Sequence, residues 1–589
     1  MQTKKWKNEW DLSVLYKSVN DSQIEKDVDE LERKIKSFVK KYSKDSSYLK
    51  NASSLKKLLD DEKMLDELPG ANKPMRYLQL LEVSGKRSDK ADKLQKKIES
   101  RFQKLSILTQ PLFLELGKID KKIQKKFLAA KELESYRYFL EQFFLNAKHQ
   151  LTEAEEKILT LKSQTSSGMW VDGVEKTLNK KVVEHNGKKI SLGEALYEIP
   201  KLSSTKRRKL HADMMEVTME VADYAEGELN AFCINKKIND ELRGFKKPYH
   251  TTFKSHETRE QDILPFTELI TKNFKIAHKF YKIKKRMLGI SSFQYQDRAA
   301  KIGNVTKRFT FDDSSRLLHE EFGKIDPKYA ATLSSFLENG QIDAHPKKGK
   351  RGGAFQWAGT NVPTAVFLNH VDTFDSLTTY AHEMGHAFHS SISKESQPLH
   401  YQGYSTAVAE TASTFFENFA FEKVFNSLTE KEKIVALHDK IERQVSTIFR
   451  QIAAFNFEKE MHEKIRSEGY LSHEEFAALL NKHMKSYIGP VLDQKEIDGY
   501  SFISWPHFRS PFYVYSYAYG ELISTALYEK YKEDTSYLNK IEAIFEAGSS
   551  LPPHKIFKKA GIDTTKTEFF ELGLKKIAKD IALLDKLTK

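Results

Sequence analysis

Apolar residues recur at helical spacing over most of the chain. Between residues 20 and 165, this spacing places apolar side chains along one side of each predicted helix. The clearest stripes are Leu31, Ile35 and Phe38, and then Leu94, Ile98, Phe102 and Leu105. Similar patterns cover residues 200–345 and continue from 376 almost to the C-terminus. The pattern predicts amphipathic helices that pack on one another.

The pattern changes between residues 344 and 370. Residues 344–353 form a loop rich in glycine and charge, and two short apolar runs follow on either side of a Gly/Asn turn. Such runs predict a β-hairpin, and Pro363 suits the start or the edge of a strand. A second stretch, 181–192, contains Val182, Val183 and Asn186-Gly187, which indicates either a small hairpin or a polar loop.

Composition supports a mainly α fold. The chain has only 26 glycines and 15 prolines in 589 residues, and this scarcity favours long helices over many short strands. Apolar residues make up 39% and aromatic residues 12%, which excludes a disordered chain. Length alone suggests several domains, and we expect a boundary near residues 190–200.

Charge and cysteine content narrow the function classes. Lys and Arg total 96 against 82 Asp and Glu, a net charge of +14. This charge is compatible with nucleic acid, an anionic membrane or acidic ligands, and equally with a lysine-rich solvated surface. Cys233 is the single cysteine, so intrachain disulfides and multi-cysteine metal sites are excluded. The sequence shows neither a signal peptide nor a membrane-spanning run, which predicts a cytoplasmic protein.

One motif carries chemistry. A helix predicted to open at Asp375, with this residue as its N-cap, contains His382-Glu383-Met384-Gly385-His386, an HExxH motif. His382 and His386 lie four residues apart, so both imidazoles share one helix face and can reach a single Zn²⁺. Glu383 lies beside the first ligand, where its carboxylate can take a proton from a metal-activated water. The opposite side of this helix is apolar, through Leu377, Tyr380, Ala381, Met384, Ala387 and Phe388.

Catalytic zinc needs a third protein ligand. His389 is close in sequence, but three ligands from under two helical turns would crowd the metal onto one helix. Glu410, 24 residues after His386, lies in another predicted helix and shares a face with Thr414 and Glu417. Glu410 is therefore the favoured third ligand. Glu417 could orient a ligand imidazole or be a solvated surface residue.

An aromatic segment near the C-terminus offers hydrogen-bond donors. It contains His507 and then tyrosines at alternate positions, namely Tyr513, Tyr515, Tyr517 and Tyr519. The segment could be a strand with one phenolic face or a helix with tyrosines around it. Tyr O–H and His N–H groups can both stabilise the oxyanion formed in peptide hydrolysis. The alternative is an aromatic stripe in the core.

Together these motifs resemble the thimet oligopeptidase / oligoendopeptidase F family of zinc metallopeptidases, and more closely its bacterial oligoendopeptidase F branch. The resemblance covers residues 200–589 well, whereas the N-terminal helices match only in character. The segments that carry it are residues 352–355, 363–369, 382–389, 409–418 and 506–520.

The resemblance implies a role for each candidate residue. His382, His386 and Glu410 would bind one Zn²⁺, and Glu383 would be the general base. His507 and Tyr517 would stabilise the transition state, with Tyr513 lining the site and His389 behind the ligands. A strand formed by Gly352, Gly353, Ala354 and Phe355 would pair with an extended peptide substrate.

The resemblance also implies a fold and an activity. The fold would be a two-lobed helical shell around a deep substrate channel, with a small β-sheet beside the HExxH helix. Residues 1–195 would form an N-terminal helical domain and residues 196–589 a zinc peptidase domain. We expect an oligoendopeptidase that cuts internal bonds of short unfolded peptides, without nucleic-acid or membrane partners. The alternatives are a zinc exopeptidase on a related helical scaffold and, more remotely, a nucleic-acid-binding protein.

Overall fold

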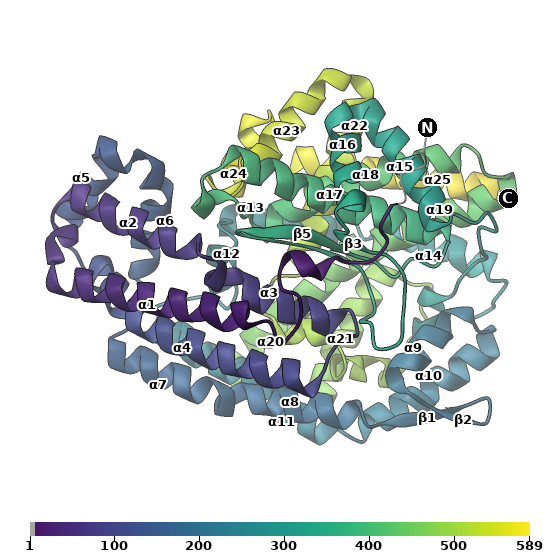
Figure 1. Ribbon diagram of the computed structural model, residues 1–589. Helices are drawn as coiled ribbons and strands as arrows, with labels where there is room; N and C mark the ends of the chain where they lie inside the picture. The colour runs from purple at the N-terminus through teal and green to yellow at the C-terminus, as the bar shows by residue number, and fades with distance from the viewer. Residues whose placement is uncertain (1–5) are drawn as a thin grey trace.

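The computed structural model describes residues 6–589, with all side chains except those of Ser163 and Gln164. Helices account for 72% of the chain and strands for 4%, which confirms the mainly α prediction (Figure 1). Residues 1–5, where a signal peptide would begin, lie outside the described residues. Over the part that is described, no helix is both long and apolar enough to cross a membrane.

Long amphipathic helices build the N-terminal part of the chain. The two predicted stripes face inward, with Leu31, Phe38, Ile98 and Leu105 buried. Part of this region has a core cluster of its own, between Phe38 and Phe144. The helices are α1 (Ser22–Lys44), α2 (Ala52–Asp66), α3 (Pro69–Val83), α4 (Asp89–Gly117), α5 (Lys121–Ala129), α6 (Arg137–Ala147), α7 (Glu153–Ser163) and α8 (Met169–Leu178).

Residues 182–191 form a hairpin rather than a polar loop. Strand β1 (Val182–His185) pairs antiparallel with β2 (Lys188–Ser191). The turn residues Asn186 and Gly187 have φ angles of 51° and 73°. Positive φ at both turn positions is the geometry that Asn-Gly favours, so this turn fixes the hairpin.

Most of the remainder of the chain shares one large core, which runs from Val174 to Leu584. Helix α9 (Leu192–Glu198) instead packs in a smaller cluster, in which Ala195 joins Val183 and Leu210. The first helices of the large core are α10 (Ser204–Met219), α11 (Ala222–Leu242), α12 (His250–Ser255), α13 (Glu260–Lys272), α14 (Lys275–Met287), α15 (Phe311–Ile325) and α16 (Pro327–Glu338). The later helices are α17 (Phe374–Ser396), α18 (Thr406–Phe425), α19 (Glu430–Val445), α20 (Gln451–Glu468), α21 (His473–Ile488), α22 (Tyr515–Glu533), α23 (Leu538–Glu546), α24 (Pro553–Lys559) and α25 (Thr567–Leu587).

A three-stranded sheet lies between these two groups of helices (Figure 1). The strand order is β3-β5-β4, so β4 is an edge strand and β5 is central. The sheet contacts α17, the helix that contains the HExxH motif. The predicted hairpin and its place beside this helix are therefore confirmed. The strands are β3 (Ile342–Asp343), β4 (Phe355–Gly359) and β5 (Val362–Phe367).

The bounds of the expected substrate strand are wrong. Only Phe355 belongs to β4, whereas Gly352, Gly353 and Ala354 precede it in a loop. Gly353 has a φ of 83°, and the side-chain amide of Asn369 donates to the carbonyls of Arg351 and Gly353, both at 2.8 Å. These bonds turn the chain just before the strand begins.

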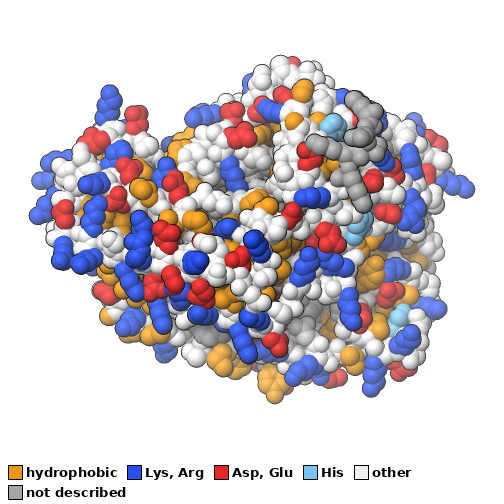
Figure 2. All heavy atoms as spheres, viewed as in Figure 1, with side chains coloured by type: hydrophobic (Ala, Val, Ile, Leu, Met, Phe, Trp, Pro, Cys, Tyr) orange, Lys and Arg blue, Asp and Glu red, His pale blue; other side chains and the backbone are white. Residues whose placement is uncertain are grey.

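Basic and acidic side chains mingle on the molecular face that Figure 2 shows. Over the N-terminal helices, blue and red groups alternate, and surface ion pairs such as Lys97–Glu25 and Lys36–Glu32 join them. On this face, the basic side chains are therefore not gathered in one patch.

Candidate metal centre and active site

Helix α17 presents the HExxH motif on a buried scaffold. The helix begins at Phe374, and Thr373 caps it by accepting a hydrogen bond from the backbone N–H of Ser376 at 3.2 Å. The expectation that Asp375 is the cap is wrong. Thr373 has the extended backbone that a cap needs, and Asp375 lies in the first turn. The predicted apolar side of the helix is buried throughout.

The backbones of α17 and α18 touch at a glycine. A Cβ atom at Gly385 would lie 2.7 Å from the carbonyl oxygen of Ala412, so only glycine allows this approach. A second close contact brings α22 against α18, because a Cβ at Gly520 would lie 2.5 Å from the Cβ of Glu410. These contacts place Glu410 opposite the two histidines of the motif.

The three predicted metal ligands converge. One ligand atom each from His382, His386 and Glu410 lies within 4.8 Å of the others. The Oε2 atom of Glu410 is 3.3 Å from Nε2 of His382 and 3.6 Å from Nε2 of His386. Two imidazole nitrogens and one carboxylate form the donor set of many catalytic zinc sites, so these residues fit a zinc ion.

His389 lies outside this group. Its ring is fully buried and stacks on Tyr404, with 3.7 Å between ring centroids. Neither ring nitrogen has a hydrogen-bond partner among the described residues, and burial lowers the pKa of His389 to about 3. His389 is thus a neutral, stacked imidazole that packs behind the motif.

Glu417 contacts the far side of the His382 ring. Its Oε2 atom lies 3.1 Å from Nδ1 of His382. Arg443 in α19 donates to Glu417 Oε1 at 3.2 Å and to Asp375 at 2.9 Å. Burial by itself would lower the pKa of His382, but the hydrogen bonds to Glu410 and Glu417 hold that pKa well above its usual value. Glu417 therefore lies where a carboxylate can orient the His382 imidazole.

Glu383 is buried between α17 and the sheet. Glu383 is 6% exposed, and burial raises the pKa of its carboxyl group to about 7. The backbone of Gln356 in β4 favours the charged form. The Oε2 atom has no hydrogen-bond partner among the described residues. One carboxyl oxygen is therefore available to accept a proton.

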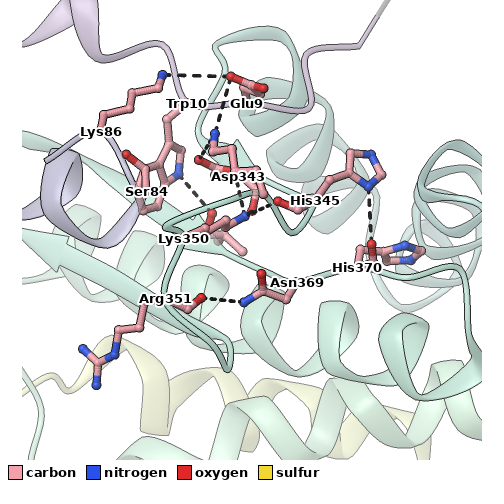
Figure 3. Close-up of polar contacts among 12 residues, drawn as sticks. Glu9, Trp10, Ser84, Lys86, Asp343, His345, Lys350, Arg351, Asn369 and His370 are labelled. Carbon is pink, nitrogen blue, oxygen red and sulfur yellow. Dashed lines mark hydrogen bonds and ion pairs between the residues drawn. The ribbon is translucent and has the colours of Figure 1, made fainter. Parts of the chain in front are cut away.

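The edge strand β4 is fixed beside this carboxyl group. Gln356 donates through its side-chain amide to Ser390 Oγ in α17, at 3.2 Å. Upstream, Lys350 donates to Asp343 Oδ1 at 2.7 Å and to the carbonyl of His345 at 2.8 Å (Figure 3). The backbone N–H of Arg351 donates to the carbonyl of Val83 at the end of α3. The N-terminal helices thus hold the loop that leads into β4.

The aromatic segment resolves into a helix. Helix α22 begins at Tyr515, and Tyr515 and Tyr519 are buried in the core. Tyr513 and Tyr517 instead cluster with His507, with ring centroids 5.7 Å apart for the tyrosine pair and 6.1 Å apart for His507 and Tyr517. The hydroxyl of Tyr513 hydrogen-bonds to Nδ1 of His507, and burial lowers the pKa of His507.

Tyr517 connects this aromatic cluster to the metal ligands. It lines a cavity of about 310 Å³ together with His382, Glu410 and Glu417. The strand interpretation is therefore wrong, because the segment enters a helix at Tyr515. The core-stripe interpretation holds for Tyr515 and Tyr519, which are buried, but not for Tyr517, which lines the cavity.

Comparison with known proteins identifies the fold and the chemistry. Residues 203–575 match the family model described as peptidase family M3, and residues 115–172 match the one described as oligopeptidase F. The chain belongs to peptidase family M3. It is an oligoendopeptidase F-type metallopeptidase, which confirms the expected activity in place of the exopeptidase and nucleic-acid-binding alternatives.

Relatives of this M3 peptidase match it over nearly the whole length. An oligoendopeptidase F homolog of Lactococcus lactis subsp. lactis is 25% identical over 595 residues, which cover 98% of this chain and 97% of the relative. A candidate peptidase from Chlamydophila abortus superposes with a TM-score of 0.83 at 22% identity, covering 98% of both chains. Oligoendopeptidase F from Enterococcus faecium gives a TM-score of 0.71 at 18% identity, covering 96% of this chain and 98% of that one.

Sequence reasoning missed two charged residues of this M3 site. Arg443 holds Glu417, and Glu521 lines the same cavity, where Gln444 donates to it at 3.1 Å. Both residues sit on helices other than α17 and α18, and neither belongs to a motif with recognisable spacing. Glu521 comes to the site because α22 packs against α18. Arg443 in α19 reaches it through its side chain, which bonds to Asp375 and Glu417.

Proposed function

We propose that His382, His386 and Glu410 hold one zinc ion and that Glu383 is the general base of this M3 peptidase. The observation that carries the proposal is the convergence of the three ligand atoms within 4.8 Å, beside a buried carboxyl with a free oxygen. Zinc-dependence is a property of family M3. When bound, the ion supplies Lewis-acid polarisation.

The side chains of the site then carry out proton transfer and stabilise the charge that develops during the reaction. Glu383 accepts the proton of the attacking water and passes it to the leaving amine. Tyr517 and His507 donate hydrogen bonds to the carbonyl oxygen of the scissile bond as negative charge develops on it. Tyr513 supports this step through its hydrogen bond to Nδ1 of His507. Glu417 keeps the His382 ring in place.

The substrates that fit this site are extended oligopeptides. Strand β4 is an edge strand beside Glu383, so a peptide could add to it by backbone hydrogen bonds. We propose that Phe355 begins this binding edge and that Gly352, Gly353 and Ala354 guide the peptide into it. Backbone pairing needs an unfolded segment. In this proposal residues 1–195 form a helical domain that faces the peptidase domain of residues 196–589 across a substrate channel.

A substitution of Glu383 tests the proposal. Glu383→Gln should lower turnover of a quenched fluorescent peptide by about 10²- to 10⁴-fold, because Gln cannot accept the proton. Its zinc content, measured by elemental analysis, should match that of the unaltered enzyme. Glu395→Gln, an exposed change at the end of the same helix, is the control. Substantial turnover by the Glu383→Gln enzyme would exclude this mechanism. For the unaltered enzyme, mass spectrometry of the peptide products should show internal cuts.

A further inference from the structure

The segment that carries His507 has little regular structure of its own. Residues 506–509 form a short 3-10 turn, and the chain then passes through Pro511 to Tyr513 before α22 begins. Pro506 and Pro511 have no backbone N–H to donate. Inside the turn, Phe508 N–H donates to Trp505 at 3.4 Å and Ser510 N–H to His507 at 3.0 Å. Support for this segment must therefore come from outside it.

One support is a buried carboxyl group beneath Phe512. Phe512 is fully buried and has a φ of 59°, a left-handed conformation that is strained for a bulky side chain. Its N–H donates to Glu458 Oε1 in α20 at 2.8 Å. Glu458 is fully buried, and its other carboxyl oxygen has no partner among the described residues. A buried acceptor of this kind favours the strained turn that directs the next residue, Tyr513.

The second support is a buried ion pair on the other side of the segment. Arg509 donates from Nε to Glu228 Oε1 in α11 at 2.8 Å and from Nη2 to Glu228 Oε2. From Nη1 it donates to the carbonyls of Phe502 at 2.7 Å and Trp505 at 3.1 Å. The Arg509 side chain is 9% exposed and that of Glu228 is 1% exposed. The rigid guanidinium fork thus fixes the chain on both sides of His507.

We propose that Glu228, Arg509 and Glu458 are positioning residues for His507 and Tyr513. The proposal rests on the roles assigned above to those two groups. None of the three touches the metal ligands, and together they hold both ends of the hydrogen bond between Tyr513 and His507. Catalytic donors need support of this kind, because a displacement of about 1 Å can cost roughly 100-fold in rate.

Arg509→Lys tests the ion pair. Lysine keeps the charge but cannot reproduce the planar fork. We expect kcat to fall by about 10- to 100-fold, while KM and zinc content change little. The matched control is Arg207→Lys, because Arg207 also forms a buried pair, with Asp297, and also donates to a backbone carbonyl, that of Leu202. The control should lower the thermal midpoint similarly and leave kcat unchanged. Equal kcat losses in both enzymes would overturn the proposal.

Two variants of Glu458 test the positioning role independently. They also keep the proposal testable if the Arg509→Lys protein does not fold. Glu458→Gln retains an acceptor for the Phe512 N–H, whereas Glu458→Met removes it at similar volume. We expect near-normal kcat for Gln and a loss of about 10-fold for Met, with zinc content unchanged in both. Similar turnover in the two variants would contradict the role of this hydrogen bond.

A double-mutant cycle separates positioning from general stability. The background His507→Ala/Tyr513→Phe lacks both positioned groups, so Arg509→Lys should cause no further loss of kcat there. If the loss is the same in both backgrounds, the positioning role is wrong while the proposed function stands. If the background substitutions alone leave kcat intact, the proposed roles of His507 and Tyr513 are wrong, and the positioning role falls with them.

Discussion

The two halves of the active site are built in different ways. His382, His386 and Glu410 stand on two long helices whose backbones touch at Gly385. His507 instead lies in a short irregular segment that two buried carboxyl groups hold from outside. In the first half, helical spacing and one close contact between two long helices set the relative positions of the reactive groups. In the second, those positions depend on partners that are distant in sequence.

This difference predicts how each half fails. A ligand on a packed helix cannot shift unless the helix shifts, so its substitution should change metal binding and leave the fold intact. A group on an externally held segment can be displaced by small local changes that leave the metal in place. Zinc content and turnover, measured on the same variants, should therefore separate the two halves.

The largest effect should come from Glu410→Ala. This change removes the charged ligand and leaves two histidines, which are too few for a catalytic zinc site. Zinc content by elemental analysis and hydrolysis of a fluorescent peptide should both fall to background. Glu422→Ala, on the same helix but in a surface pair with Lys532, should change neither. Zinc retained at the normal level would place the third ligand elsewhere.

A smaller loss, confined to turnover, should follow Tyr517→Phe. The phenylalanine keeps the ring and removes only the hydroxyl that is proposed to stabilise the oxyanion, so kcat should fall by about 10²- to 10³-fold. Zinc content should not change. Tyr519→Phe is the control, because Tyr519 is buried in the core two residues away. Equal losses in the two variants would mean that the hydroxyl of Tyr517 has no special role.

The same difference explains which parts of the fold and of the active site could be predicted from the sequence. The apolar stripes, the hairpin before α17 and the shared helix face of His382 and His386 all follow from regular periodicities. Thr373 and Asp375 are both good capping residues, so only the backbone distinguishes them. The start of β4 depends on the amide of Asn369, which lies 16 residues beyond Gly353 and gives no local signal.

The tyrosine segment shows why the second half was harder to predict. A spacing of two is typical of a strand, yet α22 begins inside the series. Tyr515 and Tyr519, one helical turn apart, enter the core, whereas Tyr517 faces the metal ligands. Glu228 and Glu458 support His507 from helices far away in the chain, so no motif could reveal them.

A moderate effect on the metal half should follow Glu417→Gln. The amide weakens the contact to Nδ1 of His382, and loss of such partners typically lowers metal affinity by about 10- to 100-fold. Competition with a chelator measures this affinity directly. Arg443→Lys should have a smaller effect, because Arg443 reaches the ligand only through Glu417. Unchanged affinity in Glu417→Gln would show that α17 alone holds the ring.

The smallest effect concerns the pH dependence of stability in the second half. Burial raises the pKa of Glu458 from 4.5 to about 8, while Phe512 N–H and Lys236 act in the opposite direction. The other titratable groups that face it are Cys233 and Tyr513. At pH values between 4.5 and about 8, the folded chain keeps a proton on Glu458 that the unfolded chain has lost. The free energy of unfolding therefore falls progressively as pH rises through this range.

Glu458→Gln should remove that loss of stability. Near pH 5 the two proteins should have similar thermal midpoints, since Glu458 is then protonated and neutral in the folded chain. By pH 8 to 9 the unaltered protein should unfold about 2 °C below the variant. The folded unaltered protein must then bury the ionised Glu458 carboxylate, whereas glutamine at this position stays neutral. Thermal unfolding of both proteins at a series of pH values gives the difference directly. Parallel curves would mean that Glu458 stays charged in the fold, and that Phe512 is held by a carboxylate rather than by a neutral carboxyl group.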